Sequence, residues 1–250
     1  MNNILIFTGA GLSAESGIST FRDNHDGLWT KYDPMQVANI ATFRKNRELV
    51  FDFYNERRLL LKDTKPNAAH LGIAELQCKY GRDRVKVFTQ NIDDLLEQAG
   101  CEDVIHVHGK FKDMQCLNCG TIWDIGYTSW SKDQPCPHCD FGVRDDATSV
   151  KPGVVFFGEQ APMYPLLHKT FKNSRKDIIV VIGTSGDVVN LRNIVGNRYS
   201  INRSFTILNN KEYDKTSFIN YHDFDEMLFE PASTAIVKIA QIIERKLEEK

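Results

Sequence analysis

Residues 4–14 of the chain read ILIFTGAGLSA, four apolar residues followed by a glycine-rich turn. The apolar run has the length and composition of a short buried strand. Gly9 to Ala14 fit the G-x-G-x-x-G/A pattern, in which glycines let the backbone approach a pyrophosphate and the N-terminus of a following helix supplies N–H donors. We therefore expect a strand, a nucleotide-binding turn and a helix here. A purely structural turn is the alternative that this pattern alone leaves open.

Five more apolar runs follow along the chain, and most of them end in polar or glycine-rich residues. We expect these runs to be strands, at residues 85–88, 104–107, 154–157, 178–182 and 205–208. Helical patterns lie between many of them, the clearest at residues 44–63, from Pro66 to Cys78, and from Ala232 onward. Strands that alternate with helices predict an α/β fold with a parallel sheet covered on both faces. Ligands bind such sheets beyond the carboxyl ends of the strands.

Two stretches fit this alternation poorly. Residues 30–80 are helical in pattern throughout, and residues 110–150 are rich in cysteine and loop-like. We interpret both as insertions that form a second, smaller domain. No second strand ending in Asp or Glu follows the first glycine turn, so the chain departs from the usual dinucleotide-binding pattern.

The composition is that of a globular protein. The 250 residues carry 31 Lys and Arg against 33 Asp and Glu, a formal charge of −2, and 42% are hydrophobic. A near-neutral charge argues against direct nucleic-acid binding, and no apolar run is long enough to span a membrane. The start of the chain lacks the basic and apolar regions of a signal peptide. We expect a cytoplasmic protein that is a monomer.

The six cysteines include four that are grouped in two CxxC pairs. Cys116 and Cys119 form the first pair, and Cys136 and Cys139 follow after sixteen intervening residues. Each pair places two thiolates on one side of a tetrahedral ion, so the two pairs complete a closed site. With all four positions filled by protein, no position is open for water. The spacing therefore predicts one structural zinc ion, and a reducing compartment rather than disulfides.

Amides and carboxylates gather where the run 85–88 ends. Gln90, Asn91, Asp93 and Asp94 follow it within six residues. These side chains are able to bind ribose hydroxyls or an amide. Either aspartate could equally be the N-cap of a helix.

Histidines and hydroxyls follow two other expected strands. His106 and His108 alternate, so on a strand they share one face, and His108 at the strand end is placed to act as a general base. Lone histidines are usually structural, which is the alternative. Gly183, Thr184 and Ser185 could supply N–H and hydroxyl groups to a phosphate or merely close a turn.

Taken together and in this order, these elements resemble the sirtuin family, the NAD-dependent protein lysine deacylases. The resemblance runs from Ile4 to about Asn209 and has the zinc-binding segment in the expected place. The matching segments are residues 9–13, 16–18, 21–23, 89–93 and 108–109, the four cysteines, and residues 154–159 and 183–185.

The resemblance implies a Rossmann-type domain of residues 1–30, 81–109 and 154–250. The remaining residues, 31–80 and 110–153, would form a small domain of the helical and zinc-binding insertions. NAD and an acyl-lysine peptide would meet in the cleft between the two domains.

The resemblance also assigns functions to individual residues. His108 and Asn91 would be catalytic, and the peptide would add as a strand beside Val154 to Phe156 and residues 186–189. Phe21 and Arg22 would belong to the cofactor loop. The implied NAD contacts are Gly9, Ala10, Gly11, Ser13, Phe21, Arg22, Gln90, Asn91, Asp93, Gly183, Thr184, Ser185 and Asn209.

The implied chemistry consumes NAD as a co-substrate. The acyl oxygen attacks C1′ of the ribose as nicotinamide leaves, and His108 then acts as general base on a ribose hydroxyl. The products are the free lysine, nicotinamide and O-acyl-ADP-ribose.

Tyr54 and Arg57 indicate which acyl group is removed. Their spacing places both on one face of a helix, where a guanidinium and a phenol are able to bind a carboxylate together. The pair resembles the Tyr-x-x-Arg signature of the sirtuins that remove succinyl and malonyl groups, a subclass that often retains deacetylase activity. The alternative is an ordinary amphipathic helix with solvated arginines.

Two other functions keep parts of the same site. ADP-ribosyl transfer to protein and plain NAD hydrolysis would use the same NAD pocket, but neither needs a clamp for an acyl carboxylate. A zinc-stabilised NAD sensor without catalysis would not need His108. Departures from the family pattern, among them Ser19, Lys110 and Lys151, fall largely on the substrate side, so we expect an active enzyme whose peptide preference is its own.

Overall fold

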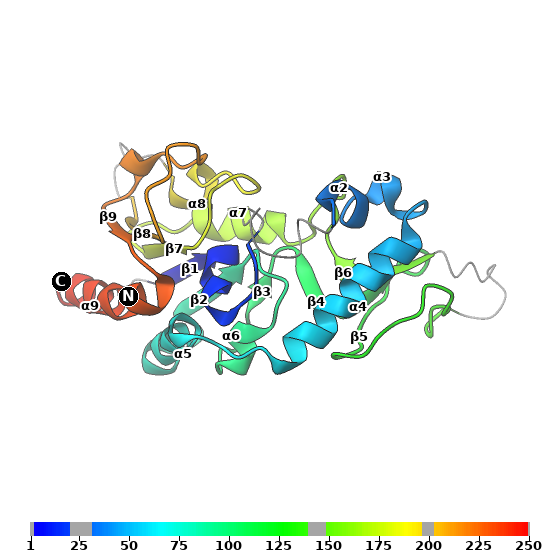
Figure 1. The fold of residues 1–250 in the computed structure, drawn as a ribbon. Coiled ribbons are helices and arrows are strands. Elements are labelled where there is room, and N and C mark those ends of the chain that lie inside the picture. Colours follow the sequence, from blue (N-terminus) through cyan, green and yellow to red (C-terminus); the bar gives the residue numbers. More distant parts are fainter. Residues whose placement is uncertain (1–2, 21–31, 140–148, 197–202, 250) are drawn as a thin grey trace. The chain divides into compact units, whose positions relative to one another are not determined.

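The computed structural model describes residues 3–20, 32–139, 149–196 and 203–249, and it consists of two compact units (Figure 1). Unit 1 comprises Met1–Thr20, Lys65–Val107 and Pro162–Lys250. Unit 2 comprises Phe21–Thr64 and His108–Ala161. Among the described helices, none is both long enough and apolar enough to cross a membrane.

Unit 1 is built on a six-stranded sheet in which every strand pair is parallel. In spatial order the strands are β3 (Ile105–His106), β2 (Val85–Thr89), β1 (Ile4–Thr8), β7 (Ile178–Ile182), β8 (Phe205–Asn210) and β9 (Glu226–Phe229). The chain moves outward from β1 in one direction and then returns to continue outward from β7 in the other. This is the order of a Rossmann-type sheet, and the reversal between β1 and β7 is where such sheets bind ligands. The predicted α/β fold is confirmed.

The two faces of this sheet bury separate apolar cores because side chains alternate along each strand. Ile4 and Ile6 belong to one core, which is covered by α5 (Ala68–Tyr80), α6 (Leu95–Gln98) and α9 (Ala232–Glu248). Leu5 and Phe7 belong to the other, which is covered by α7 (Tyr164–Lys172) and α8 (Arg192–Val195). Helices α5 and α9 lie side by side (Figure 1).

Three local expectations for unit 1 are corrected. The turn after β1 leads into two short 3₁₀ turns, η1 (Ala10–Leu12) and η2 (Ala14–Ser16), rather than directly into an α-helix. Helix α5 begins at Ala68 instead of Pro66, because the Asn67 side chain accepts from the Ala69 N–H and caps the helix. Strand β9, which follows the 3₁₀ turn η4 (Tyr221–Asp223), was not predicted.

Unit 2 combines helices with a small antiparallel sheet. The helices are α2 (Pro34–Val37), α3 (Ile40–Phe43) and α4 (Arg47–Asp63). The sheet has the order β5 (Ile122–Asp124), β4 (Gly109–Cys116) and β6 (Val150–Val154). The predicted strand at 154–157 is therefore wrong in place and in partner. The strand lies earlier, at a sheet edge, where a proline such as Pro152 is tolerated.

The two units divide the chain differently from the expected domains at residues 21–30, 65–80, 108–109 and 154–161. Helix α5 lies in unit 1 because Ala69, Ile73 and Leu76 pack into the same core as α9. Residues 154–161 lie in unit 2 because β6 pairs with β4.

Candidate functional site

Two glycine turns meet at the reversal point of the sheet in unit 1. The Gly9 N–H donates to the carbonyl of Ile182 and the Gly11 N–H to the carbonyl of Gly183, both at 2.9 Å. A Cβ placed on Gly9 would lie 2.7 Å from the Gly183 oxygen, and one on Gly183, where φ is +65°, would lie 2.4 Å from the Leu12 nitrogen. These glycines are thus required by the packing of the two turns, whatever ligand they also contact.

A closed polar cluster lies beside these turns. The Ser13 hydroxyl donates to Asp93 Oδ2 at 2.9 Å and accepts from Asn91 Nδ2 at 3.0 Å. His70 Nε2 lies 3.3 Å from the same hydroxyl. All four side chains are buried. Burial raises the pKa of Asp93, against the hydrogen bonds that it accepts from the Leu95 N–H and Ser13. His70 was not among the predicted site residues.

The predicted phosphate-side residues lie at the ends of β7 and β8. Thr184 Oγ1 accepts from Gln90 Nε2 at 3.0 Å. Ser185 donates to Asp187 at 2.8 Å. Asn209 is buried, and its amide donates to the Leu228 and Glu230 carbonyls, so in this structure it secures β9.

His108 is the first residue of the second segment of unit 2. It directly precedes Gly109, the first residue of β4, and its carbonyl accepts from the Val155 N–H at 2.9 Å. Gly109 has a φ of +79°, and a Cβ there would lie 2.0 Å from the Gly153 oxygen. Only glycine therefore allows the chain after His108 to approach β6 this closely.

The expected peptide-binding segment, Val154 to Phe156, is held by two side chains that the sequence reasoning did not assign. Lys151 is fully buried, and its Nζ donates to the Val154 carbonyl at 2.6 Å and contacts Glu159 Oε2 at 3.1 Å. Glu159 in turn accepts from the Phe156 N–H at 2.7 Å. An added peptide strand would therefore pair with the other backbone groups of this segment.

Tyr54 and Arg57 lie on α4 and are both buried, at 2% and 7% exposure, which argues against a solvated helix face. The Tyr54 ring stacks on Phe156, with 5.9 Å between ring centroids. Burial raises the pKa of Tyr54 above its usual value and lowers the pKa of Arg57 to about 10, so the guanidinium is still charged at neutral pH. Arg57 Nε is buried and has no hydrogen-bond partner among the described residues.

Arg58, the next residue on α4, differs from Arg57. Its Nε donates to the Phe111 carbonyl at 2.6 Å and its Nη1 to Asn55 Oδ1 at 2.9 Å. Arg58 is therefore committed to holding the fold, whereas the buried Arg57 Nε has no such partner among the described residues.

The four cysteines come together as predicted. All four Sγ atoms lie within 4.8 Å of one another, with Cys116 to Cys139 at 3.6 Å and Cys119 to Cys136 at 3.8 Å. Tetrahedral zinc with its usual sulfur bonds has ligand atoms about 3.8 Å apart. The cluster fits a structural zinc ion with four thiolate ligands.

The described residues thus fall into two groups. Most of the predicted NAD contacts gather at one edge of the sheet in unit 1, whereas His108, the Tyr54–Arg57 pair and the cysteines lie in unit 2. Phe21 and Arg22, predicted to contact NAD, lie outside the described residues.

Comparisons with known proteins identify the family to which the chain belongs. The profile of the Sir2 family matches residues 9–190. The chain is 42% identical to an "NAD-dependent protein deacylase" of Helicobacter hepaticus, with 98% of each chain covered. It is 43% identical to a protein of the same name from Campylobacter jejuni, covering 100% of this chain and 99% of that one.

Solved structures show the same fold. A crystal structure of a Sir2 homologue in complex with NAD superposes with a TM-score of 0.76 at 32% identity, covering 98% of this chain and 90% of that chain. With a family match over most of its length and relatives of this similarity, the chain belongs to the Sir2 family, whose members are the sirtuins.

Proposed function

We propose that this chain is an NAD-dependent protein-lysine deacylase whose pocket favours acyl groups ending in a carboxylate, succinyl and malonyl among them, and also accepts acetyl. Family membership and the deacylase names of its relatives support the reaction. The observation that carries the acyl preference is Arg57, a buried and charged guanidinium whose Nε has no partner among the described residues.

A bound carboxylate would supply the partner that the Arg57 Nε lacks among the described residues. A guanidinium binds a carboxylate through two parallel hydrogen bonds, and such bonds are stronger away from water. Tyr54, one helical turn before Arg57, would add a phenolic donor, because its raised pKa keeps the hydroxyl protonated. An acetyl group offers no charge to this pair and would leave the Arg57 Nε unpaired.

The NAD side of the reaction is assigned to unit 1. Bound NAD supplies a ribose carbon made electrophilic by its positively charged nicotinamide leaving group. Ser13, Asn91 and Asp93 would orient the nicotinamide ribose, since their polar atoms are already fixed by one another. The paired glycine turns would leave room for the pyrophosphate.

His108 would provide the general base. An imidazole that titrates near neutral pH is able to take a proton from a ribose hydroxyl, which lets that oxygen attack the acyl carbon. Gly109 and the Val155 hydrogen bond fix the backbone at the carbonyl of this residue and directly after it. The products would be the free lysine, nicotinamide and O-acyl-ADP-ribose.

The test is mass spectrometry of matched succinyl-lysine and acetyl-lysine peptides incubated with NAD, for the wild type and Arg57→Met. We expect the wild type to remove succinyl groups, and we expect this rate to fall by 100-fold or more in Arg57→Met. A fall of that order corresponds to the loss of one charge-assisted bidentate pair. Deacetylation should be retained. Arg44→Met, which removes an exposed arginine of the same unit, is the matched control and should change neither reaction.

Other outcomes separate the alternatives. Acetyl removal alone would keep the deacylase and refute the carboxylate pocket. Nicotinamide release with both peptides unchanged would indicate ADP-ribosyl transfer or NAD hydrolysis. NAD binding without nicotinamide release would indicate a sensor.

The remaining proposals concern the setting of the enzyme. We infer that its partners are proteins carrying acylated lysines and that it works as a monomer. A four-thiolate zinc site is most secure in a reducing compartment, which supports the cytoplasm.

A further inference from the structure

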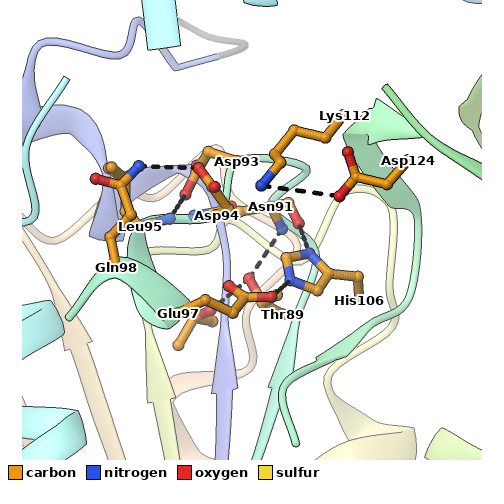
Figure 2. Close-up of polar contacts among 11 residues, drawn as sticks. Thr89, Asn91, Asp93, Asp94, Leu95, Glu97, Gln98, His106, Lys112 and Asp124 are labelled. Atoms are coloured by element: carbon orange, nitrogen blue, oxygen red, sulfur yellow. Dashed lines mark hydrogen bonds and ion pairs between the residues drawn. The ribbon is translucent and has the colours of Figure 1, made fainter. Parts of the chain in front are cut away.

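His106 is a buried histidine next to a predicted catalytic residue, and nothing in the proposed reaction uses it. It ends β3, beside Thr89 of β2, and its side chain is 3% exposed. Nδ1 lies 2.8 Å from the main-chain carbonyl oxygen of Asn91, and Nε2 lies 2.8 Å from Glu97 Oε1 (Figure 2).

The two partners determine where the protons of this ring must be. A main-chain carbonyl only accepts hydrogen bonds, so Nδ1 has to carry a proton. Glu97 comes from α6, and its side chain is 34% exposed, which favours the charged carboxylate; this too only accepts. A neutral imidazole has one N–H donor and cannot serve both partners. With Glu97 ionised, only the imidazolium provides one N–H for each of the two acceptors.

His70, the other buried histidine of unit 1, shows the opposite arrangement. Its Nδ1 faces the main-chain N–H of Asn67 at 3.2 Å, so Nδ1 must accept and the ring must be neutral. Burial lowers the pKa of His70 to about 4. Two buried histidines thus flank the Ser13–Asn91 cluster with opposite roles at Nδ1, which donates in His106 and accepts in His70.

Asn91 is held at three atoms by this network. Its N–H donates to Thr89 Oγ1 at 3.0 Å, its side-chain amide donates to Ser13 Oγ at 3.0 Å, and its carbonyl accepts from His106. Thr89 Oγ1 also accepts from the Thr8 hydroxyl, which ties the turn to β1. Of these three restraints, only the one from His106 is made directly by an ionisable side chain.

We propose that Glu97 and His106 are positioning residues, which hold the Asn91 carbonyl so that the Asn91 amide stays directed at Ser13 and the NAD-binding cluster. This deepens the proposed function and rests on it, because it assumes that Asn91 takes part in the reaction. Glu97 keeps the ring charged, and the charged ring fixes the main chain. Neither residue needs to touch substrate.

The pair makes the restraint dependent on pH. The groups that face His106 are Glu97 from α6, Asp93 from the turn after β2, and the Asn91 carbonyl. Cys101 lies near Glu97. Loss of the ring proton at high pH would leave an Nε2 lone pair facing a carboxylate. The ring would lose that partner, and the Asn91 carbonyl would be held less firmly.

Substitution of Glu97 separates a positioning role from a merely structural one. In Glu97→Gln the amide is able to donate to a neutral Nε2 while Nδ1–H still serves Asn91, so no extra proton is needed. We expect the wild type to lose kcat at alkaline pH, and we expect Glu97→Gln to keep kcat within about twofold near neutral pH and to lack that alkaline decline. We expect His106→Ala to lower kcat by roughly 10- to 100-fold, with little change in the peptide KM.

Glu102→Gln is the matched control, since it removes an exposed carboxylate of the same unit that is bonded only to Arg82 within the described contacts. Its rates and pH profile should match those of the wild type. Wild-type kcat for His106→Ala, or an unaltered alkaline decline for Glu97→Gln, would overturn the proposal.

A measurement without substrate keeps this proposal distinct from the proposed function. Nitrogen-15 NMR of the imidazole rings, with His106 assigned from the His106→Ala spectrum, should show two protonated nitrogens for His106 at neutral pH and one for His70. A neutral His106 ring would refute the inference even in an active deacylase. If the wild type removes no acyl group, the proposed function fails, and the role in catalysis assigned to the pair fails with it, while the spectrum still decides the protonation.

Discussion

The interiors of the two units are built from different kinds of residue. In unit 1 the five residues of β1 and the five of β7 are all buried, and the two cores on the faces of the sheet consist of apolar side chains. In unit 2 Arg58 and Lys151 are completely buried, and Arg47 and Arg57 are nearly so.

Most of the buried cations of unit 2 donate hydrogen bonds to backbone carbonyls in the strands of the small sheet. Arg58 donates to Phe111, Lys151 to Val154, and Arg47 to Val150 at 3.1 Å. Unit 2 therefore adds specific polar partners and a four-cysteine site to its apolar contacts, whereas unit 1 depends on the apolar area that it buries.

The largest expected effect comes from removing the metal, and it should be confined to unit 2. Zinc binding contributes folding free energy of about 10 kcal/mol in small zinc domains, so chelation should release β4 and β5. Hydrogen exchange read by mass spectrometry should show fast exchange at residues 109–124 and unchanged protection of β1 and β7.

Cys139→Ala should reproduce the effect of the chelator, whereas Cys78→Ala, which changes an exposed cysteine outside the cluster, should not. Equal loss of protection in both units would contradict the division into two separately stabilised parts.

The difference between the apolar interior of unit 1 and the partly charged interior of unit 2 also explains how much of each unit the sequence predicts. The strands of unit 1 are short apolar runs, so pattern alone identified β1, β2, β7 and β8 almost to the residue. Strand β9 was missed because its residues alternate between half-buried and exposed at the sheet edge. In unit 2, β6 contains Lys151, Pro152 and Gly153, a composition that is typical of a loop. Only the structure shows that the Lys151 ammonium is buried.

The candidate site divides in a similar way. The zinc ligands were predictable because their spacing alone specifies the chemistry. The partners of Asn91 were not, because His106 is separated from Asn91 by fifteen residues and a hydrogen bond to a main-chain carbonyl leaves no pattern in the sequence. His70, at the third position of a capping box, was hidden for the same reason.

The second prediction concerns the close packing in unit 1. Gly183→Ala places a Cβ 2.4 Å from the Leu12 nitrogen in a backbone with φ at +65°, so neither the contact nor the conformation is tolerated. We expect a loss of roughly 2–5 kcal/mol in the free energy of unfolding, measured in urea. Gly17→Ala, also at positive φ but with open space around it, should cost only about 1–2 kcal/mol. Equal costs would show that the turns do not need to touch.

The third prediction tests the polar interior of unit 2. Arg58→Leu removes three donors from α4 and leaves the buried Phe111 carbonyl and the Asn55 side chain without that partner. We expect a loss of roughly 2–4 kcal/mol in the same measurement. Arg44→Leu, at an exposed position, should stay within about 0.5 kcal/mol of the wild type. If Arg58→Leu is as stable as the wild type, buried cations are not what holds this unit.

The smallest effect in this series is a pH dependence, and it belongs to unit 1. His70 has an ordinary pKa of 6.5 and a folded value of about 4, so the unfolded chain binds a proton over this range that the folded chain does not. The contribution of the neutral His70 ring to the free energy of unfolding is fully present above pH 6.5. It is lost as the pH falls toward 4, by up to about 3 kcal/mol. His70→Gln keeps an acceptor for the Asn67 N–H and cannot titrate, so its unfolding free energy should decline less over that interval. His168→Gln, at an exposed position, should decline as the wild type does. If the unfolding free energies of His70→Gln and the wild type decline equally between pH 6.5 and 4, the neutral His70 ring is not what the Asn67 N–H requires.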